Sequence, residues 1–436
     1  MIQLKSSCWR TIVLTLLCIQ LVFPILNAQK IPIAQKNYTS EIKKLNKKKQ
    51  IQAAFSIIDE IDDQTTEDLI TLTEIEAPPF KEGKRAKAFK TMLEQTEMDK
   101  VWIDEVGNVI GLKKGDEGNR VVVLDAHLDT VFPEGTNVTV KKKGDTLYAP
   151  GIGDDTRGLT MLLAIAKSMQ KTALRPKADI WFVGSVGEEG LGDLRGVKHL
   201  FRDGAPKIDS WIAIDGGAGG RVNNAGLGST RYKAVFKGNG GHSWGAFGLA
   251  NPHHALGYAI SHFTKEAKKY TDKGPKTSFN IGRIGGGTSV NSIPFESWME
   301  VDMRSVDAAR LVQIDSIFKV SMNTAVQEYN TSGIKDKITL DLIKIGDRPS
   351  GELPETTPLV QRAIAATTLF GEKPRLTRGS TNGNIPIALG VPAVTLGRGG
   401  KGGGAHSLGE WFMNEDGTTA IKLALLITMA EAGLGK

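Results

Sequence analysis

Short apolar runs alternate with amphipathic segments along most of the chain from about residue 55. Four apolar runs predict buried strands, at residues 121–124, 180–183, 211–214 and 393–396. Between them, segments such as 159–169 and 359–370 carry apolar residues at spacings of three and four, which is the period of a helix. Strands that alternate with helices are typical of α/β proteins, so we predict a mostly parallel sheet with helices on both faces.

The order of elements changes between residues 230 and 346. The pattern there predicts, in turn, a strand at 232–236, a helix after Pro252, strands near 278–284 and 298–303, a helix from Ala308 and a strand near 338–342. This β-α-β-β-α-β order is the ferredoxin-like arrangement. Because the α/β alternation resumes after Pro354, we predict an inserted α+β lid domain. The catalytic domain would then consist of residues 55–229 and 347–436.

Residues 1–28 have the pattern of a secretory signal peptide. Lys5 and Arg10 precede an apolar stretch at 11–26, and small residues lead up to Ala28. The stretch is shorter than the roughly 20 apolar residues of a membrane span. We therefore expect cleavage near Ala28, export to the periplasm or the medium, and no stable membrane span afterwards. An uncleaved anchor is the alternative.

The cysteines restrict the chemistry of the cleaved chain. Cys8 and Cys18 are the only two, and both lie within the leader. A mature chain without cysteine has no disulfide, no thiol nucleophile and no metal site with a cysteine ligand.

The net charge of +7 is unevenly distributed. Residues 1–50 contain nine Lys and Arg but a single acid, which leaves residues 51–436 at −1. The excess lies in the leader and in a lysine-rich tail at 29–54. The run from Lys43 to Lys49 is most simply a solvated tail or the start of an exposed helix. Since the body of the protein is not basic, we expect no nucleic-acid partner.

Acids and histidines follow the predicted strands or precede a helix. The groups are Asp125, His127 and Asp129; Asp154 and Asp155; Glu188 and Glu189; Asp215; and His406. In an open α/β sheet such positions meet in one crevice. Each group alone has an ordinary explanation, such as a helix cap. Together, however, the like charges would repel one another unless cations neutralised them.

The two histidines and the carboxylates form a ligand set suited to zinc, with cobalt or manganese as alternatives. Two divalent ions bridged by one carboxylate would use the whole set. Such a site activates water and polarises a carbonyl, which is the chemistry of amide hydrolysis.

Seven strings, taken together, resemble the dizinc exopeptidase and amidohydrolase family of peptidase T, glutamate carboxypeptidase, aminoacylase and succinyl-diaminopimelate desuccinylase. They occur in the family's order from about residue 66 to the C-terminus. The strings are Ala126-His127-Leu128-Asp129-Thr130-Val131, Gly151-Ile152-Gly153-Asp154-Asp155, Gly187-Glu188-Glu189-Gly190, Ile214-Asp215-Gly216-Gly217, Gly241-His242-Ser243, Asn291-Ser292-Ile293-Pro294 and His406-Ser407.

The resemblance implies a role for each matching residue. The metal ligands would be His127, Asp154, Glu189, Asp215 and His406, with Asp154 bridging two ions. Asp129 would orient His127. Glu188 would be the general base that takes a proton from the attacking water and passes it to the leaving amine.

The resemblance also extends to the inserted domain. His242 resembles the histidine that stabilises the tetrahedral oxyanion, often from the partner subunit, because the family's lid often mediates dimerisation. Asn291 and Arg304 resemble residues that hold the carboxylate or backbone of the substrate. One departure is visible, since Thr156-Arg157 follows the aspartate pair where the family commonly has a lysine.

Three other interpretations have weaker support in the sequence. Residues 241–245 match G-x-S-x-G, which would make Ser243 the nucleophile of a serine hydrolase, but glycines separate it from the preceding strand and the next helix begins only near Pro252. The glycine-rich stretch 397–404 lacks the Ser or Thr of a P-loop. A non-catalytic binding protein of the same fold is the third possibility, although every ligand position is filled.

We therefore expect an exported metal-dependent exopeptidase that acts on short peptides, as an aminopeptidase, dipeptidase or carboxypeptidase. An N-acyl amino acid amidohydrolase is the alternative. The sequence leaves open which end of the substrate is cleaved.

Overall fold

The computed structural model describes residues 31–435. The predicted signal peptide, Cys8 and Cys18 lie outside the described residues. No helix among the residues described is long and apolar enough to span a membrane.

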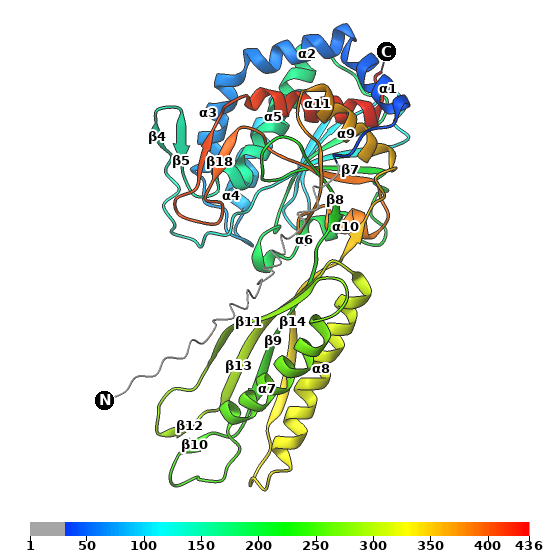
Figure 1. Cartoon of the computed structure of the whole chain (residues 1–436). Helices are drawn as coiled ribbons and strands as arrows, with labels where there is room; N and C mark the ends of the chain where they lie inside the picture. The colour runs from blue at the N-terminus through cyan, green and yellow to red at the C-terminus, as the bar shows by residue number, and fades with distance from the viewer. Residues whose placement is uncertain (1–30, 436) are drawn as a thin grey trace, which may run out of the picture. The chain divides into compact units, whose positions relative to one another are not determined.

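The catalytic domain is built on a nine-stranded sheet (Figure 1). Its strands run in the order β1-β2-β6-β3-β7-β17-β8-β15, and β16 pairs with β8. The four predicted strands form the parallel centre β6-β3-β7-β17, so these predictions are confirmed. The bounds are β1 Lys100–Ile103, β2 Val109–Lys113, β3 Val121–His127, β6 Asp179–Ser185, β7 Ser210–Ile214, β8 Arg221–Gly226, β15 Gly351–Glu352, β16 Arg375–Gly379 and β17 Ala393–Leu396.

Helices cover both faces of this sheet. Alternate residues of β3 point to opposite faces: Val122 and Leu124 join the larger core cluster, whereas Val123 joins a smaller one. Helices α1, α2, α4, α5, α9 and α11 supply residues to the larger cluster, and α6 and α10 to the smaller. The bounds are α1 Lys36–Asn46, α2 Lys49–Glu60, α3 Asp62–Thr73, α4 Gly83–Glu94, α5 Arg157–Lys171, α6 Arg195–Leu200, α9 Pro358–Leu369, α10 Asn384–Ala388 and α11 Gly417–Ala432.

The lysine-rich segment is part of the catalytic domain, which corrects the predicted boundary at residue 55. From Lys36 onward it forms α1 and the first half of α2, and residue 55 lies inside α2. Ile42 and Ile51 are fully buried in the larger core cluster, while the lysines from Lys36 to Lys49 are exposed. A helix that places one apolar residue per turn or two against the core can carry lysines on its remaining surface. The lysine run therefore gave no indication that one face of these helices packs against the core of the catalytic domain.

The inserted domain has the predicted ferredoxin-like order. Its four-stranded sheet runs β11-β13-β9-β14, and all three pairings are antiparallel. Helices α7 and α8 pack side by side on one face (Figure 1). Their N-termini are capped by Asn251 and Asp307, whose side chains accept backbone N–H groups of the first turn. The bounds are β9 Gly228–Lys237, α7 Pro252–Thr271, β11 Thr277–Gly286, β13 Glu296–Ser305, α8 Ala308–Asn330 and β14 Thr339–Arg348.

Two smaller sheets complete the described structure. One has four strands in the order β18-β19-β5-β4 and belongs to the catalytic domain, and the other pairs β10 with β12. Short helical turns occupy Ile152–Thr156 and Gly190–Gly192. The strand bounds are β4 Lys141–Lys143, β5 Thr146–Tyr148, β10 Gly241–His242, β12 Ser292–Ile293, β18 Lys401–Gly403 and β19 Trp411–Met413.

Candidate metal centre

The predicted ligands meet at the carboxyl ends of the parallel strands. His127 is the last residue of β3, where it pairs with Ser185 at the end of β6. Glu188 and Glu189 follow β6, and Asp215 directly follows β7. The parallel register brings these strand ends to one edge of the sheet. Asp154, Glu188, Glu189, Asp215 and His406 line one cavity of about 420 Å³ at this edge.

Asp154 lies between the two histidines. Its Oδ1 is 3.1 Å from Nε2 of His127, and its Oδ2 is 3.2 Å from Nε2 of His406. The same nitrogen of His406 is 3.0 Å from Oε1 of Glu189. One ligand atom each from His127, Asp154 and Glu189 lies within 4.8 Å of the others. Because each oxygen of Asp154 faces a different imidazole, this carboxylate has the geometry of a bridge between two cation positions.

The cluster requires positive charge. Hydrogen bonds to Asp154 and Glu189 raise the pKa of His406 to about 10. Burial opposes protonation of His127, yet hydrogen bonds to Asp129 and Asp154 raise its pKa well above the ordinary value. In the absence of metal, protons on the imidazoles therefore balance the carboxylates. Divalent ions bound at the same nitrogen and oxygen atoms would displace those protons.

The donor set fits zinc, cobalt or manganese ions. It offers imidazole nitrogens and carboxylate oxygens at separations that a shared cation can span, and no thiolate lies among the residues that line the cavity. All five predicted ligands are thus brought together by the fold.

Asp129 ties the end of β3 to the loop that follows β6. Its two carboxylate oxygens accept the N–H groups of Glu188 at 2.9 Å and Glu189 at 2.8 Å. Its carbonyl oxygen lies 2.9 Å from Nδ1 of His127, whereas its carboxylate is 3.6 Å away. The residue thus orients His127 through its backbone and holds the two glutamates through its side chain.

Asp155 also holds the end of β3, through hydrogen bonds to the backbone. Its carboxylate accepts the N–H of His127 at 3.2 Å and that of Gly158 at 3.2 Å, at the start of α5. Thr156 and Arg157 follow the aspartate pair where the family commonly has a lysine. The hydroxyl of Thr156 donates to the carbonyl of Gly151, and Arg157 donates to the carbonyl of Gly417 and lies over the ring of Phe412. It is buried and does not line the cavity. The departure from the family pattern is therefore a packing difference outside the site.

Glu410, which no sequence motif indicates, holds the turn that presents Asp154. Its carboxylate accepts three backbone N–H groups, from Gly151 at 2.8 Å and from Gly153 and Asp154 at 2.9 Å each. Gly151 is required at the turn because its φ is +78° and an added Cβ would lie 2.5 Å from Thr130. A single glutamate four residues after His406 belonged to no recognisable motif, so no sequence signal pointed to it.

Four arginines also line the cavity. They are Arg221, Arg231, Arg304 and Arg348. Arg304 was predicted as a substrate residue, whereas the other three were not. Asp302 accepts hydrogen bonds from Nε of both Arg231 and Arg304. Its carboxylate thereby orients two guanidinium groups at the end of the inserted domain that joins the catalytic domain.

His242 and Asn291 lie together, but not at this cavity. His242 pairs with Ser292 in the β10–β12 ribbon, and the carbonyl of Asn291 accepts the N–H of Ser243. The ribbon follows the distal end of β9, about 25 Å along the strand from the position opposite Arg304. Neither residue is among those that line the cavity of the same chain.

Ser243 does not occupy a nucleophile elbow. It follows a two-residue strand and lies in an exposed turn, and α7 begins only at Pro252. A serine nucleophile of that type requires a strand that runs into the serine and a helix directly behind it. The geometry therefore gives no support to the serine-hydrolase alternative.

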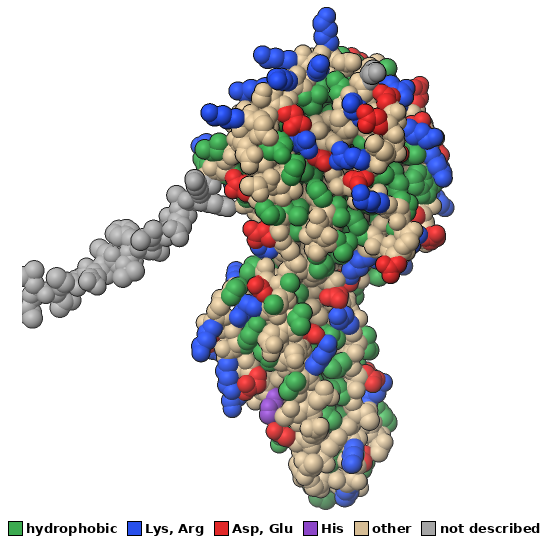
Figure 2. Space-filling view, turned by 90° about the vertical axis from the view of Figure 1, so that its right-hand side faces the viewer, with side chains coloured by type: hydrophobic (Ala, Val, Ile, Leu, Met, Phe, Trp, Pro, Cys, Tyr) green, Lys and Arg blue, Asp and Glu red, His purple; other side chains and the backbone are tan. Residues whose placement is uncertain are grey.

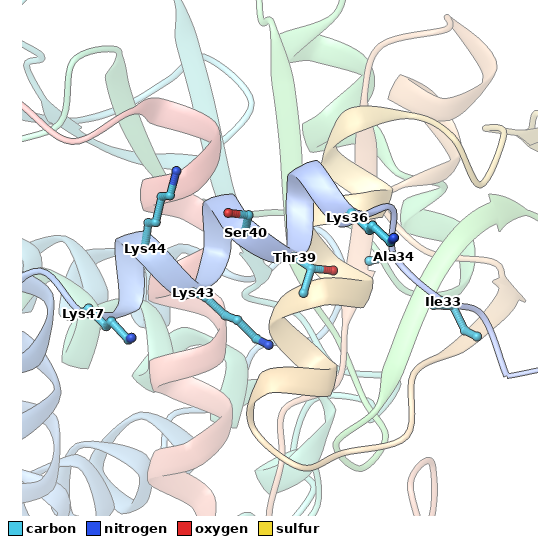
Figure 3. A pocket seen from close by; sticks show the side chains of 8 residues that line it. All are labelled: Ile33, Ala34, Lys36, Thr39, Ser40, Lys43, Lys44 and Lys47. Carbon is cyan, nitrogen blue, oxygen red and sulfur yellow. The ribbon is translucent and has the colours of Figure 1, made fainter.

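A second surface groove, of about 510 Å³, lies along α1 (Figure 3). Its charged lining residues are Lys36, Lys43, Lys44 and Lys47, and its lining contains no acid or histidine. It offers no ligand set for a metal.

On the face shown in Figure 2, Lys and Arg side chains are interspersed with Asp and Glu.

Fold and site together define a metal-dependent hydrolase of peptide or amide bonds. The model of peptidase family M20/M25/M40 matches residues 123–430, and the chain belongs to this family.

The chain is also similar to known proteins in sequence and in fold. A protein of Pyrococcus abyssi (strain GE5 / Orsay), provisionally named a LysW-lysine/LysW-ornithine hydrolase, is 26% identical over 353 residues, covering 77% of this chain and 85% of its own. The fold matches the di-peptidase Dug1p of Saccharomyces cerevisiae with a TM-score of 0.69 at 16% identity, over 88% of this chain and 99% of that one. Aminopeptidase PepT of Bacillus cereus ATCC 10987 matches with a TM-score of 0.65 at 19% identity, over 84% and 98%.

Replacing Glu410 by glutamine should weaken binding of Zn²⁺ by about 10- to 100-fold, because the amide has one oxygen and would turn an NH₂ group toward a backbone donor of the Asp154 turn. A competition titration against a chromogenic chelator measures this affinity. Glu415→Gln, an exposed change nearby, should leave it unaltered. Wild-type affinity in a folded Glu410→Gln protein would refute the role of Glu410.

Proposed function

We propose that this protein is an exported exopeptidase that hydrolyses short peptides with two bound divalent metal ions, zinc in the first place. The observation that carries the proposal is the position of Asp154 between His127 and His406, with Glu188 in the same cavity. The export part rests on the signal-like pattern of residues 1–28.

The bound ions would supply a water of lowered pKa and a Lewis acid for the scissile carbonyl. His127 and Asp215 are suited to one ion, Glu189 and His406 to the other, and Asp154 to both. Each Asp154 oxygen faces a different histidine, and His406 lies 3.0 Å from Glu189, which supports the pairing of these two residues. Asp215 lines the same cavity and is assigned to the position of His127 as part of the proposal.

Glu188 has the position of a general base. It is adjacent to the ligand Glu189, it lines the cavity, and its side chain is 6% exposed. Burial raises the pKa of Glu188 to about 8, although Arg348 beside it lowers the value. In the proposed reaction, a carboxylate oxygen of Glu188 takes a proton from the attacking water and then gives it to the leaving amine.

The arginines favour a substrate with an anionic group close to the scissile bond. No aromatic side chain is among the residues that line the cavity. Nε of Arg304 is held by Asp302, and no hydrogen bond within the described chain occupies its two terminal nitrogens. A guanidinium with two free parallel donors suits a carboxylate. An N-acyl amino acid also presents that group, so an amidohydrolase is the second candidate.

Di- and tripeptides blocked at either end, tested beside N-acyl amino acids on the metal-loaded protein, distinguish these candidates. Dependence on a free amine would identify an aminopeptidase or dipeptidase, the activities named for two of the structural neighbours. Dependence on a free carboxylate alone would favour a carboxypeptidase or an N-acyl amidohydrolase. Hydrolysis of none of them would contradict the proposal.

Replacing Glu188 by glutamine should lower kcat by about 10²- to 10⁴-fold while two metal ions remain bound, because the amide cannot accept the proton but preserves the shape of the side chain. Steady-state kinetics and elemental analysis of the same sample measure the two quantities. Glu189→Gln is the matched variant and should lose metal as well as activity. Unchanged kcat in the metal-loaded Glu188→Gln protein would disprove the assigned mechanism.

His242 is proposed to act on the site of a second copy. Its Nδ1 accepts the N–H groups of Trp244 and Gly245, so the neutral ring carries its proton on Nε2, where it can be donated to an oxyanion. Large apolar side chains are exposed around the same ribbon: Trp244, Phe247, Val290 and Phe295. An exposed apolar patch of this kind supports a homodimer formed through the inserted domain.

Hybrid dimers test this arrangement. His242→Ala and Glu188→Gln homodimers should each be nearly inactive. After the two chains are co-expressed at equal levels, about half of the dimers contain one chain of each kind, with one complete site per dimer. The mixture should then show about a quarter of wild-type activity. No recovery in a sample in which hybrid dimers are isolated would rule out action from the partner.

A further inference from the structure

The loop at residues 188–193, which carries both Glu188 and Glu189, is held by the inserted domain at three points. Arg231 on β9 donates from Nη1 to the carbonyl of Gly190 at 3.0 Å. The N–H of Asp347, near the end of β14, donates to the carboxylate of Asp193 at 2.9 Å. Arg348, the last residue of β14, contacts Glu188. The loop that places a metal ligand and the general base is thus fixed from the other domain.

Arg348 makes the most direct of these contacts. Its Nη1 is 3.2 Å from Oε1 of Glu188, and its Nη2 donates to the backbone carbonyl of the same residue. Nη1 also donates to the carbonyl of Ser380 at 3.3 Å and to its hydroxyl at 3.2 Å. The side chains of Arg348 and Glu188 are only 5% and 6% exposed. A buried pair of this kind is strongly perturbed when one member is removed.

The two oxygens of Glu188 have different surroundings. Oε1 is held by Arg348, whereas Oε2 has no hydrogen-bond partner among the described residues. Fixing one oxygen of a carboxylate while the other is left free orients the free oxygen without occupying it. Proton transfer requires such placement to within a fraction of an ångström.

We propose that Arg348 is a positioning residue that transmits the orientation of the inserted domain to the general base. Arg348 lies at the strand end that joins the two domains, and it contacts both the side chain and the backbone carbonyl of Glu188. A movement of β14 relative to the catalytic domain would shift Glu188 together with its loop. The proposal rests on the proposed function of Glu188 as the base.

Arg378 provides a matched control. Its guanidinium likewise pairs with a glutamate, Glu352, and donates to the carbonyls of Gly226 and Gly351 near the same domain junction. It makes no contact with the loop at residues 188–193. If the loss of any arginine at this junction disturbed the loop, Arg378→Ala would change its hydrogen exchange as well.

The experiment compares Arg348→Ala, Arg348→Lys and Arg378→Ala in the full-length metal-loaded enzyme. For each protein, kcat and KM are measured on the best peptide substrate, the bound metal is counted, and amide hydrogen exchange is followed across residues 186–194. Arg348→Ala should lower kcat by about 10- to 100-fold with KM changed less than threefold and both ions retained. Exchange in the loop should become faster. Arg348→Lys should recover part of kcat, since one ammonium can reach the carboxylate but cannot also grip the carbonyl.

Arg378→Ala should leave kcat and loop exchange as in the wild type. The proposal is overturned if Arg348→Ala, or Arg348→Lys should the alanine variant fail to fold, keeps wild-type kcat and loop exchange. It is also overturned if Arg378→Ala causes equal changes. The hydrogen-exchange result is independent of the reaction, so it separates this proposal from the proposed function. If Arg348→Ala changes hydrogen exchange in the loop while Glu188→Gln remains active, Glu188 is not the base. The contact through which Arg348 holds the loop would still be supported.

Discussion

The rest of the structure must accommodate one constraint, which is the repulsion among carboxylates that lie together at one edge of a parallel sheet. Asp154, Glu188, Glu189 and Asp215 line the same cavity, and two histidines beside them have pKa values raised by these acids. Side chains of one sign cannot share a buried crevice without counter-charge. Bound metal cations remove that conflict and at the same time provide the chemistry. The same constraint thus explains both the stability of the site and its reactivity.

Much of the surrounding structure serves to hold these charged groups in fixed places through backbone contacts. Glu410 accepts three N–H groups of the Asp154 turn, and Asp129 accepts those of Glu188 and Glu189. In both residues the carboxylate accepts hydrogen bonds from the main chain, and Asp129 also lies 3.6 Å from Nδ1 of His127. The inserted domain adds a further restraint through Arg348. The positions of the ligands therefore do not rely on the metal alone.

The elements with strong periodicity were predictable from the sequence, and so was the meeting of the acids and histidines at one edge of the sheet. Runs of four apolar residues predicted the central strands. Polar residues at strand ends indicated His127 and Asp215, and the aspartate pair ahead of a helix indicated Asp154, because parallel topology fixes where strand ends meet. Glu410 and Arg348 were not predictable, since each acts through a tertiary contact with distant residues. The packing of α1 was not predicted, because its many lysines are typical of a solvated segment. Its lysines are exposed, but Ile42 is buried in the core.

Counting the metal ions bound per chain with and without Asp154 tests the central claim most directly. After equilibration with Zn²⁺ and removal of the excess, elemental analysis of the wild-type protein should give two ions per chain. Asp154→Ala should retain almost none, because both cation positions lose their shared ligand and the remaining groups no longer surround a common centre. Two ions retained by a folded Asp154→Ala protein would contradict the account, as would a single ion in the wild type.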